Sequence, residues 1–275
     1  MARPVRNGRI RVTRGSMFWR EVGYGPTLIF LHGSWQDGSQ WLPLLASLGQ
    51  DFHCIAPDLL GFGESSSLTE GKYSVDLQVD CLAEYLKHLR IQPHILIADS
   101  VGAWIAVRYS LQYPEKIRGL ILMAPEGLVH PTLEQRWRKI RWLASPWSAR
   151  GWGLQLTMPF MKWLGGDRWL HRIWQQRQQF RRYQATCQLL FQRRRTALLA
   201  ESLNDVLSDL DIPVLLLHPE QCSETTQLIH QLFQDLAPKT HRLAKIPGNE
   251  STAWQEALAT IHTFAKTNAI NSTLQ

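Results

Sequence analysis

The sequence predicts an α/β protein: a mostly parallel, doubly wound sheet with antiparallel edge strands at its N-terminal side and an inserted block of helices. Short apolar runs alternate with amphipathic helical patterns along most of the chain, which is typical of parallel strands joined by right-handed crossovers. Residues 8–22 instead indicate two strands joined by a tight turn. Residues 126–210 show helical patterns and no clear strand. We therefore expect one core, formed by 1–125 and 211–275, with a helical insertion at 126–210.

Apolar periodicity predicts each element before the insertion. Residues 27–31 are continuously apolar, as in a strand that is covered on both faces. Residues 73–89 place Val75, Val79 and Leu82 at helical spacing. In chain order we expect strands at 10–13, 17–22, 27–31, 52–56, 95–97 and 117–123, with helices at 39–48, at 73–89 and from Ser100 to just before Pro114.

The same alternation resumes after the insertion. We expect a strand at 213–217, a helix at 225–236, a strand at 240–246 and a closing helix at 252–266. In open α/β sheets, ligand sites lie at the carboxyl ends of the strands. The residues that follow such predicted strand ends are Ser34, Phe62, Ser100, Glu126 and Cys222.

One serine stands on a predicted turn between a strand and a helix. The apolar run 95–97 ends at Ala98, and the next helical pattern begins beyond Ser100. Small residues at 98 and 102 allow such a turn to close without Cβ clashes. The pattern Ala98-x-Ser100-x-Gly102 is one substitution from Gly-x-Ser-x-Gly, which presents a nucleophilic serine.

Four segments, at 31–35, 56–65, 98–102 and 113–122, together resemble the α/β-hydrolase fold superfamily in order and spacing. The resemblance implies that Ser100 is the nucleophile and that the amides of Ser34 and Val101 form the oxyanion hole. Such a hole requires fixed N–H donors near the developing charge. The resemblance also implies that Asp58 anchors its loop and that 126–210 is a cap over the substrate pocket.

The chain departs from the family pattern at the other two triad positions. Cys222 occupies the position of the acid, and Ser251 occupies the position of the base. Glu126, after the preceding strand, is a candidate alternative acid, or else a carboxylate at the start of a helix; Glu220 is another candidate. No His lies between Arg242 and Thr260. A serine hydroxyl without an adjacent base is a poor nucleophile.

Other histidines offer weak replacements for the base. His218 ends a strand at the site edge, where we expect a structural role, and His241 begins its strand at the opposite edge. His130 and His171 belong to the insertion and would have to swing in. Asp99 precedes the serine, where a carboxylate suits the start of a helix.

Two hypotheses about function follow from the resemblance. In the first, the chain is a serine hydrolase that uses Ser100 and a relocated base on ester or acyl bonds of a lipophilic small molecule, without a cofactor. In the second, it is a catalytically inactive binding or scaffold member. A fluorophosphonate probe, which labels activated serines, discriminates between them.

Charge and tryptophan are concentrated in the insertion. Residues 136–195 contain fourteen Lys or Arg, one acidic residue and seven of the twelve Trp, so the block carries +13 while the rest of the chain carries −6. Basic and Trp-rich surfaces are typical of contact with anionic membranes. The alternative is an ordinary cap whose Trp side chains line an apolar pocket. We expect no nucleic-acid partner, because no recognised binding module is present.

Composition excludes several other classes of protein. No apolar run is long enough to span a bilayer, and no secretory signal is evident. The cysteines are scattered without metal-ligand spacing, so we expect free thiols, no metal site and a cytoplasmic protein, with peripheral membrane contact as the alternative. These cysteines are Cys54, Cys81, Cys187 and Cys222.

Overall fold

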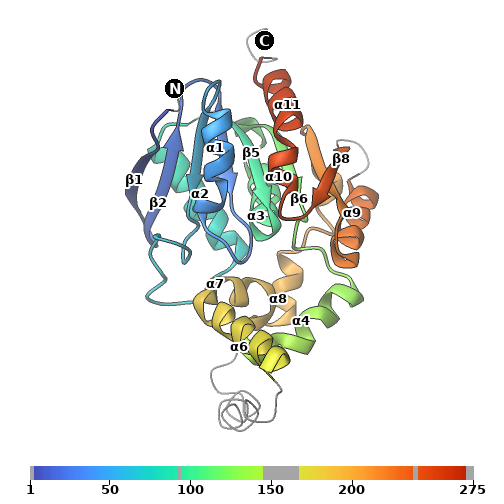
Figure 1. The fold of residues 1–275 in the computed structure, drawn as a ribbon. Helices are drawn as coiled ribbons and strands as arrows, with labels where there is room; N and C mark the ends of the chain where they lie inside the picture. The colour runs from blue at the N-terminus through green and yellow to red at the C-terminus, as the bar shows by residue number, and fades with distance from the viewer. Residues whose placement is uncertain (1–2, 92–93, 145–166, 238–240, 271–275) are drawn as a thin grey trace.

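A computed structural model describes residues 3–91, 94–144, 167–237 and 241–270. An eight-stranded sheet forms its centre, in the order β1-β2-β4-β3-β5-β6-β7-β8 (Figure 1). β1 and β2 pair antiparallel, β2 pairs antiparallel with β4, and all remaining pairs are parallel. The predicted fold class is therefore confirmed. The strands are β1 Arg6–Val12, β2 Gly15–Val22, β3 Thr27–Leu31, β4 His53–Pro57, β5 His94–Asp99, β6 Ile117–Met123, β7 Val214–Gln221 and β8 His241–Asn249.

Helices cover both faces of the sheet, which explains why the central strands are continuously apolar. In β3, Leu28 and Phe30 pack with one face and Ile29 and Leu31 with the other, because successive side chains alternate. One face is covered by α2 Val75–His88, α3 Ser100–Gln112 and α9 Glu224–Leu236; the other is covered by α1 Leu42–Leu48, α10 Ala253–Glu256 and α11 Leu258–Ile270. Short 3₁₀ turns lie at Gly38–Trp41, Pro114–Lys116 and Leu207–Asp209.

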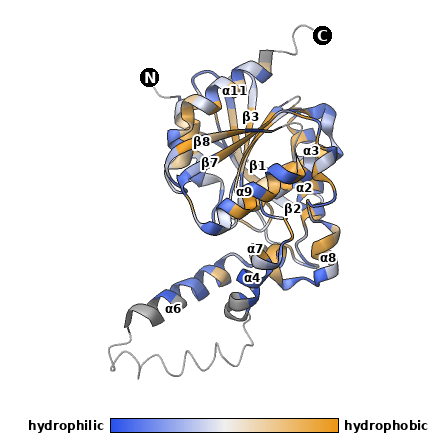
Figure 2. Cartoon of the chain, turned by 90° about the vertical axis from the view of Figure 1, so that its right-hand side faces the viewer, coloured by the Kyte–Doolittle hydropathy of each residue, from blue (hydrophilic) through white to orange (hydrophobic). Residues whose placement is uncertain are grey.

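The insertion forms a helical lobe at one end of the core, here called the cap (Figures 1 and 2). Its α6 is largely hydrophilic (Figure 2). In its described part the insertion contains no strand, as the sequence indicates. Its helices are α4 Pro131–Ala144, α6 Asp167–Arg182, α7 Gln184–Cys187, the π-helical segment Gln188–Gln192 and α8 Arg195–Ala200.

Hydrogen bonds from core residues to Glu201 and Gln188 help to hold the cap against the core. The indole N–H of Trp104 in α3 donates to the Glu201 carbonyl at 2.8 Å, and the Val75 amide donates to the Glu201 carboxylate at 3.0 Å. The Tyr73 amide donates to the side-chain oxygen of Gln188 at 2.9 Å. Glu201 is buried and paired with Arg193, so this attachment is also shielded from water.

Several element boundaries differ from the sequence prediction. β1 begins at Arg6 rather than at residue 10. The sequence pattern missed its first residues because they are polar and exposed at the edge of the sheet. β8 continues through Pro247, which is compatible with an edge strand because proline lacks one ladder donor. The closing helix is divided at Ala257 into α10 and α11. Among the described helices, none combines the length and the apolar character needed to cross a membrane.

Candidate active site

Ser100 occupies the sharp turn that the sequence predicts. β5 ends at Asp99 and α3 begins at Ser100, whose φ is +49°. A positive φ at a residue with a Cβ costs conformational energy, and such strain concentrates at functional sites. Gly102 lets this turn press against β3, since a Cβ there would lie 2.5 Å from the His32 carbonyl oxygen and 2.6 Å from that of Leu31.

Gly102→Ala should lower the free energy of unfolding by about 1–3 kcal/mol, because the added methyl group forces α3 away from β3. The loss is expected even though alanine favours a helix over glycine by about 1 kcal/mol. Urea unfolding of the two proteins measures it. Gly71→Ala measures the separate cost of a positive φ without a clash, since Gly71 has a φ of +90° and no neighbour within 4 Å of the added Cβ, whereas Gly102 has no positive φ. Equal midpoints for Gly102→Ala and the parent would contradict the close packing.

The oxyanion-hole candidates lie beside this turn. The hydroxyl oxygens of Ser34 and Ser100 are 2.7 Å apart and hydrogen-bonded. In the described part of the chain, the amides of Ser34 and Val101 donate to no carbonyl of a turn or loop. The sequence therefore identified residues that come together, although the hydrogen bond between the two hydroxyls was not predicted.

His32 is close in sequence to this site, but its ring has a structural role. The Leu59 amide donates to its Nε2 at 3.1 Å, so we assign the proton to Nδ1, which donates to the Gly33 carbonyl at 3.0 Å. Burial lowers the pKa of His32 and keeps the ring neutral. Both ring nitrogens are engaged, and neither serves Ser100.

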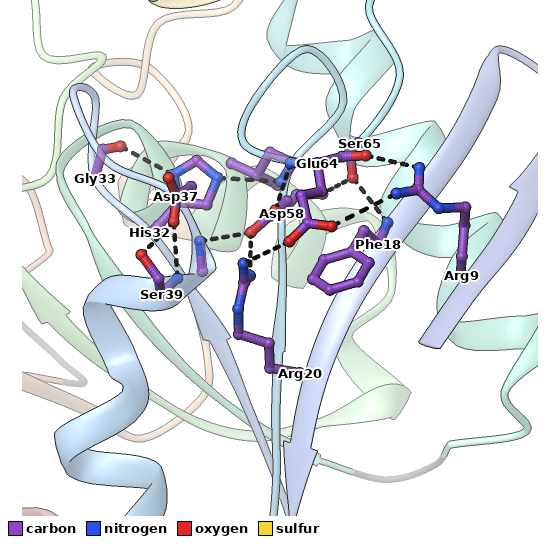
Figure 3. Close-up of polar contacts among 12 residues, drawn as sticks. Arg9, Phe18, Arg20, His32, Gly33, Asp37, Ser39, Asp58, Glu64 and Ser65 are labelled. Atoms are coloured by element: carbon purple, nitrogen blue, oxygen red, sulfur yellow. Dashed lines mark hydrogen bonds and ion pairs between the residues drawn. The ribbon is translucent and has the colours of Figure 1, made fainter. Parts of the chain in front are cut away.

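Asp58 anchors the neighbouring loop, in agreement with the resemblance (Figure 3). Its carboxylate is fully buried and pairs with Arg20, with Nη1 and Oδ1 2.8 Å apart. The amides of Gly38 and Glu64 donate to the same carboxylate at 2.7 and 2.8 Å. This loop connects β4 to the site edge, so Asp58 positions the site without contacting Ser100.

Cys222, at the position predicted for the triad acid, lies at one end of a series of hydrogen bonds through His218 and His230. The Ala124 amide donates to His230 Nε2 at 3.0 Å, so the proton of a neutral His230 must be on Nδ1. That nitrogen is 2.7 Å from His218 Nδ1, which therefore accepts. The proton of His218 is then on Nε2, which lies 3.9 Å from Cys222 Sγ and donates to it. The His218 ring faces Cys222 as a donor and has no free lone pair to act as a base.

Desolvation reinforces this assignment. Burial lowers the pKa of His230 to about 3 and also lowers the pKa of His218, so both rings are neutral at pH 7. Burial, together with the nearby charge of Glu250, raises the pKa of the Cys222 thiol. Cys222 is thus an uncharged thiol where working triads have a carboxylate.

Ser251 does not point toward a reaction centre. It is exposed, and its hydroxyl donates to Asn249 Oδ1 at 2.6 Å within a local turn. The adjacent Glu250 carboxylate accepts from the Thr226 hydroxyl at 2.6 Å and from the Ser223 amide at 3.0 Å. Burial opposes the ionisation of Glu250, but these bonds outweigh it and lower its pKa.

The replacement acids and bases that the sequence offers are also engaged or distant. The carboxylate of Glu126 pairs with Arg136 at 2.9 Å, while its amide donates to the Ser100 carbonyl at 3.1 Å. Glu220 is exposed. His130 Nδ1 accepts from the Thr132 amide at 3.3 Å. The side chains of His171 and His241 lie outside the described part of the chain.

Aromatic rings and a threonine of the cap pack onto the site. Trp35, next to the oxyanion turn, lies 5.0 Å from the Phe180 ring and 6.3 Å from the Tyr183 ring between centroids. The buried Thr186 hydroxyl donates to the Ser34 carbonyl. These contacts place side chains of the cap against Trp35 and against the backbone of Ser34. No periodic signal marks Thr186 as a site residue.

Asp99 is partly buried beneath the oxyanion turn. Desolvation raises its pKa to about 6, and the negative charges of Glu250 and Glu126 raise it further. A hydrogen bond from Gln40 at 3.3 Å lowers the pKa but does not outweigh these effects. Asp99 occupies the N-cap position of α3, as expected. Its side chain, however, forms no capping hydrogen bond to the helix.

Comparison with known proteins agrees with this architecture. A sequence profile of the alpha/beta hydrolase fold matches residues 26–221. A 2-hydroxymuconate semialdehyde hydrolase from Pseudomonas sp. (strain CF600) is 33% identical over 117 residues, which are 42% of this chain and 41% of that protein. The chain thus matches about two fifths of the length of this relative.

Solved structures resemble the fold over nearly the whole chain. A thermophilic esterase from Thermogutta terrifontis has a TM-score of 0.70 at 19% identity, covering 96% of this chain and 99% of the other. The haloalkane dehalogenase DbeA from Bradyrhizobium elkani USDA94 has a TM-score of 0.72 at 19% identity, covering 98% and 100%. These likenesses concern the backbone arrangement.

Proposed function

Because this chain belongs to the alpha/beta hydrolase fold family, we propose that it is a binding member in which Ser100 does not act as a triad nucleophile. Its proposed ligand is a lipophilic small molecule, and its proposed setting is the cytoplasm. The observation that carries the proposal is the partner of Ser100. In the described part of the chain, the Ser100 hydroxyl is hydrogen-bonded to the Ser34 hydroxyl and to no imidazole.

The size of the catalytic loss supports this choice. Removing the base of a serine triad costs about 10⁶ in rate, and an oxyanion hole with substrate binding alone retains about 10³–10⁴ over water. Here the acid position is an uncharged thiol, and the base position is a serine bonded to Asn249. The contacts of the cap with Trp35 and with the Ser34 carbonyl also support a closed site.

One observation favours slow hydrolysis through Ser100 as the second candidate. The turn keeps its positive φ at Ser100, and the amides of Ser34 and Val101 donate to no turn or loop carbonyl in the described residues. A tetrahedral oxyanion requires unpaired N–H donors of this kind beside the nucleophile. A base would still have to come from a rearrangement of the cap.

A fluorophosphonate probe separates the two candidates. The full chain is incubated with the probe, and intact mass is recorded beside a triad-containing esterase and the Ser100→Ala variant. We expect no adduct on the parent chain under conditions that label the esterase fully. Circular dichroism checks that the unlabelled protein is folded. An adduct on the parent that is absent from Ser100→Ala would reject the binding proposal in favour of hydrolysis.

A further inference from the structure

A cleft lies at the junction of the cap with α3, and the residues of the Ser100 turn are not part of its lining. It has a volume of about 530 Å³, and its lining includes Trp104 of α3 and residues 126–129 after β6. Ser34, Ser100 and Val101 do not line it. Its volume falls within the range of about 300–1,000 Å³ that is usual for small-molecule sites.

The floor of the cleft is apolar. The Trp137 and Phe191 rings stack with their centroids 5.2 Å apart. Leu128 and Leu190 are buried beside them, and Leu199 is 39% exposed at the mouth. Contact with such a surface favours a hydrocarbon chain by about 25 cal/mol for each Å² removed from water.

The other part of the lining is cationic. Arg195 pairs with Glu134 and Arg193 pairs with Glu201. Arg138 and Arg141 are exposed at the cleft and have no carboxylate partner among the described residues. Residues 145–166 contain neither Asp nor Glu.

The lining also contains a buried hydrogen-bond donor without a partner among the described residues. The Arg193 side chain is only 7% exposed, and its Nε has no hydrogen-bond partner among the described residues. Leaving a buried N–H unpaired costs about 1–3 kcal/mol, so an acceptor that enters the cleft would recover part of that free energy. Glu126, the remaining carboxylate of the lining besides Glu134, is neutralised by Arg136.

We propose that this cleft binds an anionic amphiphile with a single hydrocarbon chain. The carboxylate or phosphate head lies against Arg138 and Arg141, and the chain covers Trp137 and Phe191. The planar guanidinium group pairs with both kinds of head through two parallel N–H donors. The inference rests on the proposed binding role, but it uses residues that are separate from the Ser100 turn.

Calorimetric titration of the full chain with three twelve-carbon ligands tests the head and the tail. Laurate is expected to bind at least about tenfold more tightly than dodecanol, since one charge-assisted hydrogen bond is worth about a factor of ten. Dodecyltrimethylammonium is expected not to bind. Flotation with phosphatidylcholine vesicles, with and without phosphatidylglycerol, then distinguishes a membrane lipid from a free acid as the source of the ligand. Equal affinity for laurate and dodecanol would overturn the proposal.

Two sets of variants locate the site. The double variant Arg138→Gln/Arg141→Gln should lose laurate affinity by about tenfold or more. The control Arg172→Gln/Arg181→Gln removes the same charge from exposed cap positions outside the lining and should bind as the parent does. Leu199→Asp, also at an exposed position, places a negative charge at the mouth of the cleft and should weaken the binding of laurate relative to the parent.

The outcomes separate this inference from the proposed function. An equal loss of laurate affinity in both double variants would overturn the proposal that laurate binds in the cleft, and would indicate a general attraction of laurate to the positive charge of the cap. Ser100→Ala should bind laurate as the parent does. Laurate that binds at the Ser100 turn instead would be lost in Ser100→Ala and retained in Arg138→Gln/Arg141→Gln. If the probe labels Ser100 and laurate binding still depends on Arg138 and Arg141, the proposal that Ser100 is inactive is rejected and the proposal of a binding cleft stands.

Discussion

Replacing Asp58 by Ala should lower the free energy of unfolding by about 3–5 kcal/mol. The carboxylate is fully buried, it pairs with Arg20, and it accepts from the amides of Gly38 and Glu64. Breaking a buried ion pair costs about 3–5 kcal/mol, and Arg20 is then left, among the described residues, with only the Glu64 carboxylate, which is 3.2 Å away and 54% exposed. The amides lose their acceptor in the same variant. Such a loss is a large part of the 5–15 kcal/mol that holds a typical domain together.

Urea unfolding followed by circular dichroism measures this loss, with Asp76→Ala as the matched control. Asp76 pairs with Arg108 at 3.2 Å, but its side chain is 60% exposed. Exposed pairs contribute only about 0–1 kcal/mol. Similar midpoints for the two variants would contradict the anchoring role of Asp58.

Replacing Asp99 by Asn should stabilise the protein at pH 8 and have a much smaller effect at pH 4. The pKa of Asp99 is about 6 in the folded chain against 3.8 for an ordinary aspartate, because burial disfavours its charge. Between these two values the native state holds a proton that the unfolded state has released, so stability falls as pH rises. Above pH 6 the full cost remains, at most about 3 kcal/mol. Asparagine has no charge and avoids it.

The difference between the unfolding free energies of parent and variant, taken from pH 4 to pH 8, isolates this contribution. Asp37→Asn supplies a control of opposite sign. Burial opposes the charge of Asp37, but hydrogen bonds from Ser39 outweigh it and lower its pKa. Its variant should therefore be less stable than the parent at pH 8 and more nearly equal at low pH. A constant difference for Asp99→Asn across this range would refute the raised pKa.

The sheet could be predicted because the information is local. A run such as Thr27–Leu31 is apolar on both faces, and helices on both faces are what it requires. β1 extends four residues further than predicted, since the side chains of Arg6 and Arg9 are exposed and carry no apolar signal. The two helices at 253–270 share one apolar pattern, and the break at Ala257 does not interrupt it.

The site could be predicted only in part. Ser34, Ser100 and Val101 come together because short motifs fix the local turns. His230 was missed because it lies within α9, where a single buried histidine has no sequence signature. Its pairing with His218 depends on how α9 packs against β7.

The buried attachment of the cap also constrains how the chain moves. For the cap to swing open as a lid, Glu201 must leave both Trp104 and the Val75 amide, and Gln188 must leave the Tyr73 amide. Exchanging each of these hydrogen bonds for one to water costs about 0.5–1.5 kcal/mol, and the apolar contacts between cap and core are lost at the same time. Opening is therefore a rare, cooperative event rather than a fast fluctuation, and the amide hydrogens of Tyr73 and Val75 can exchange with solvent only when it occurs. The rate of deuterium uptake at these two amides therefore measures how often the cap opens.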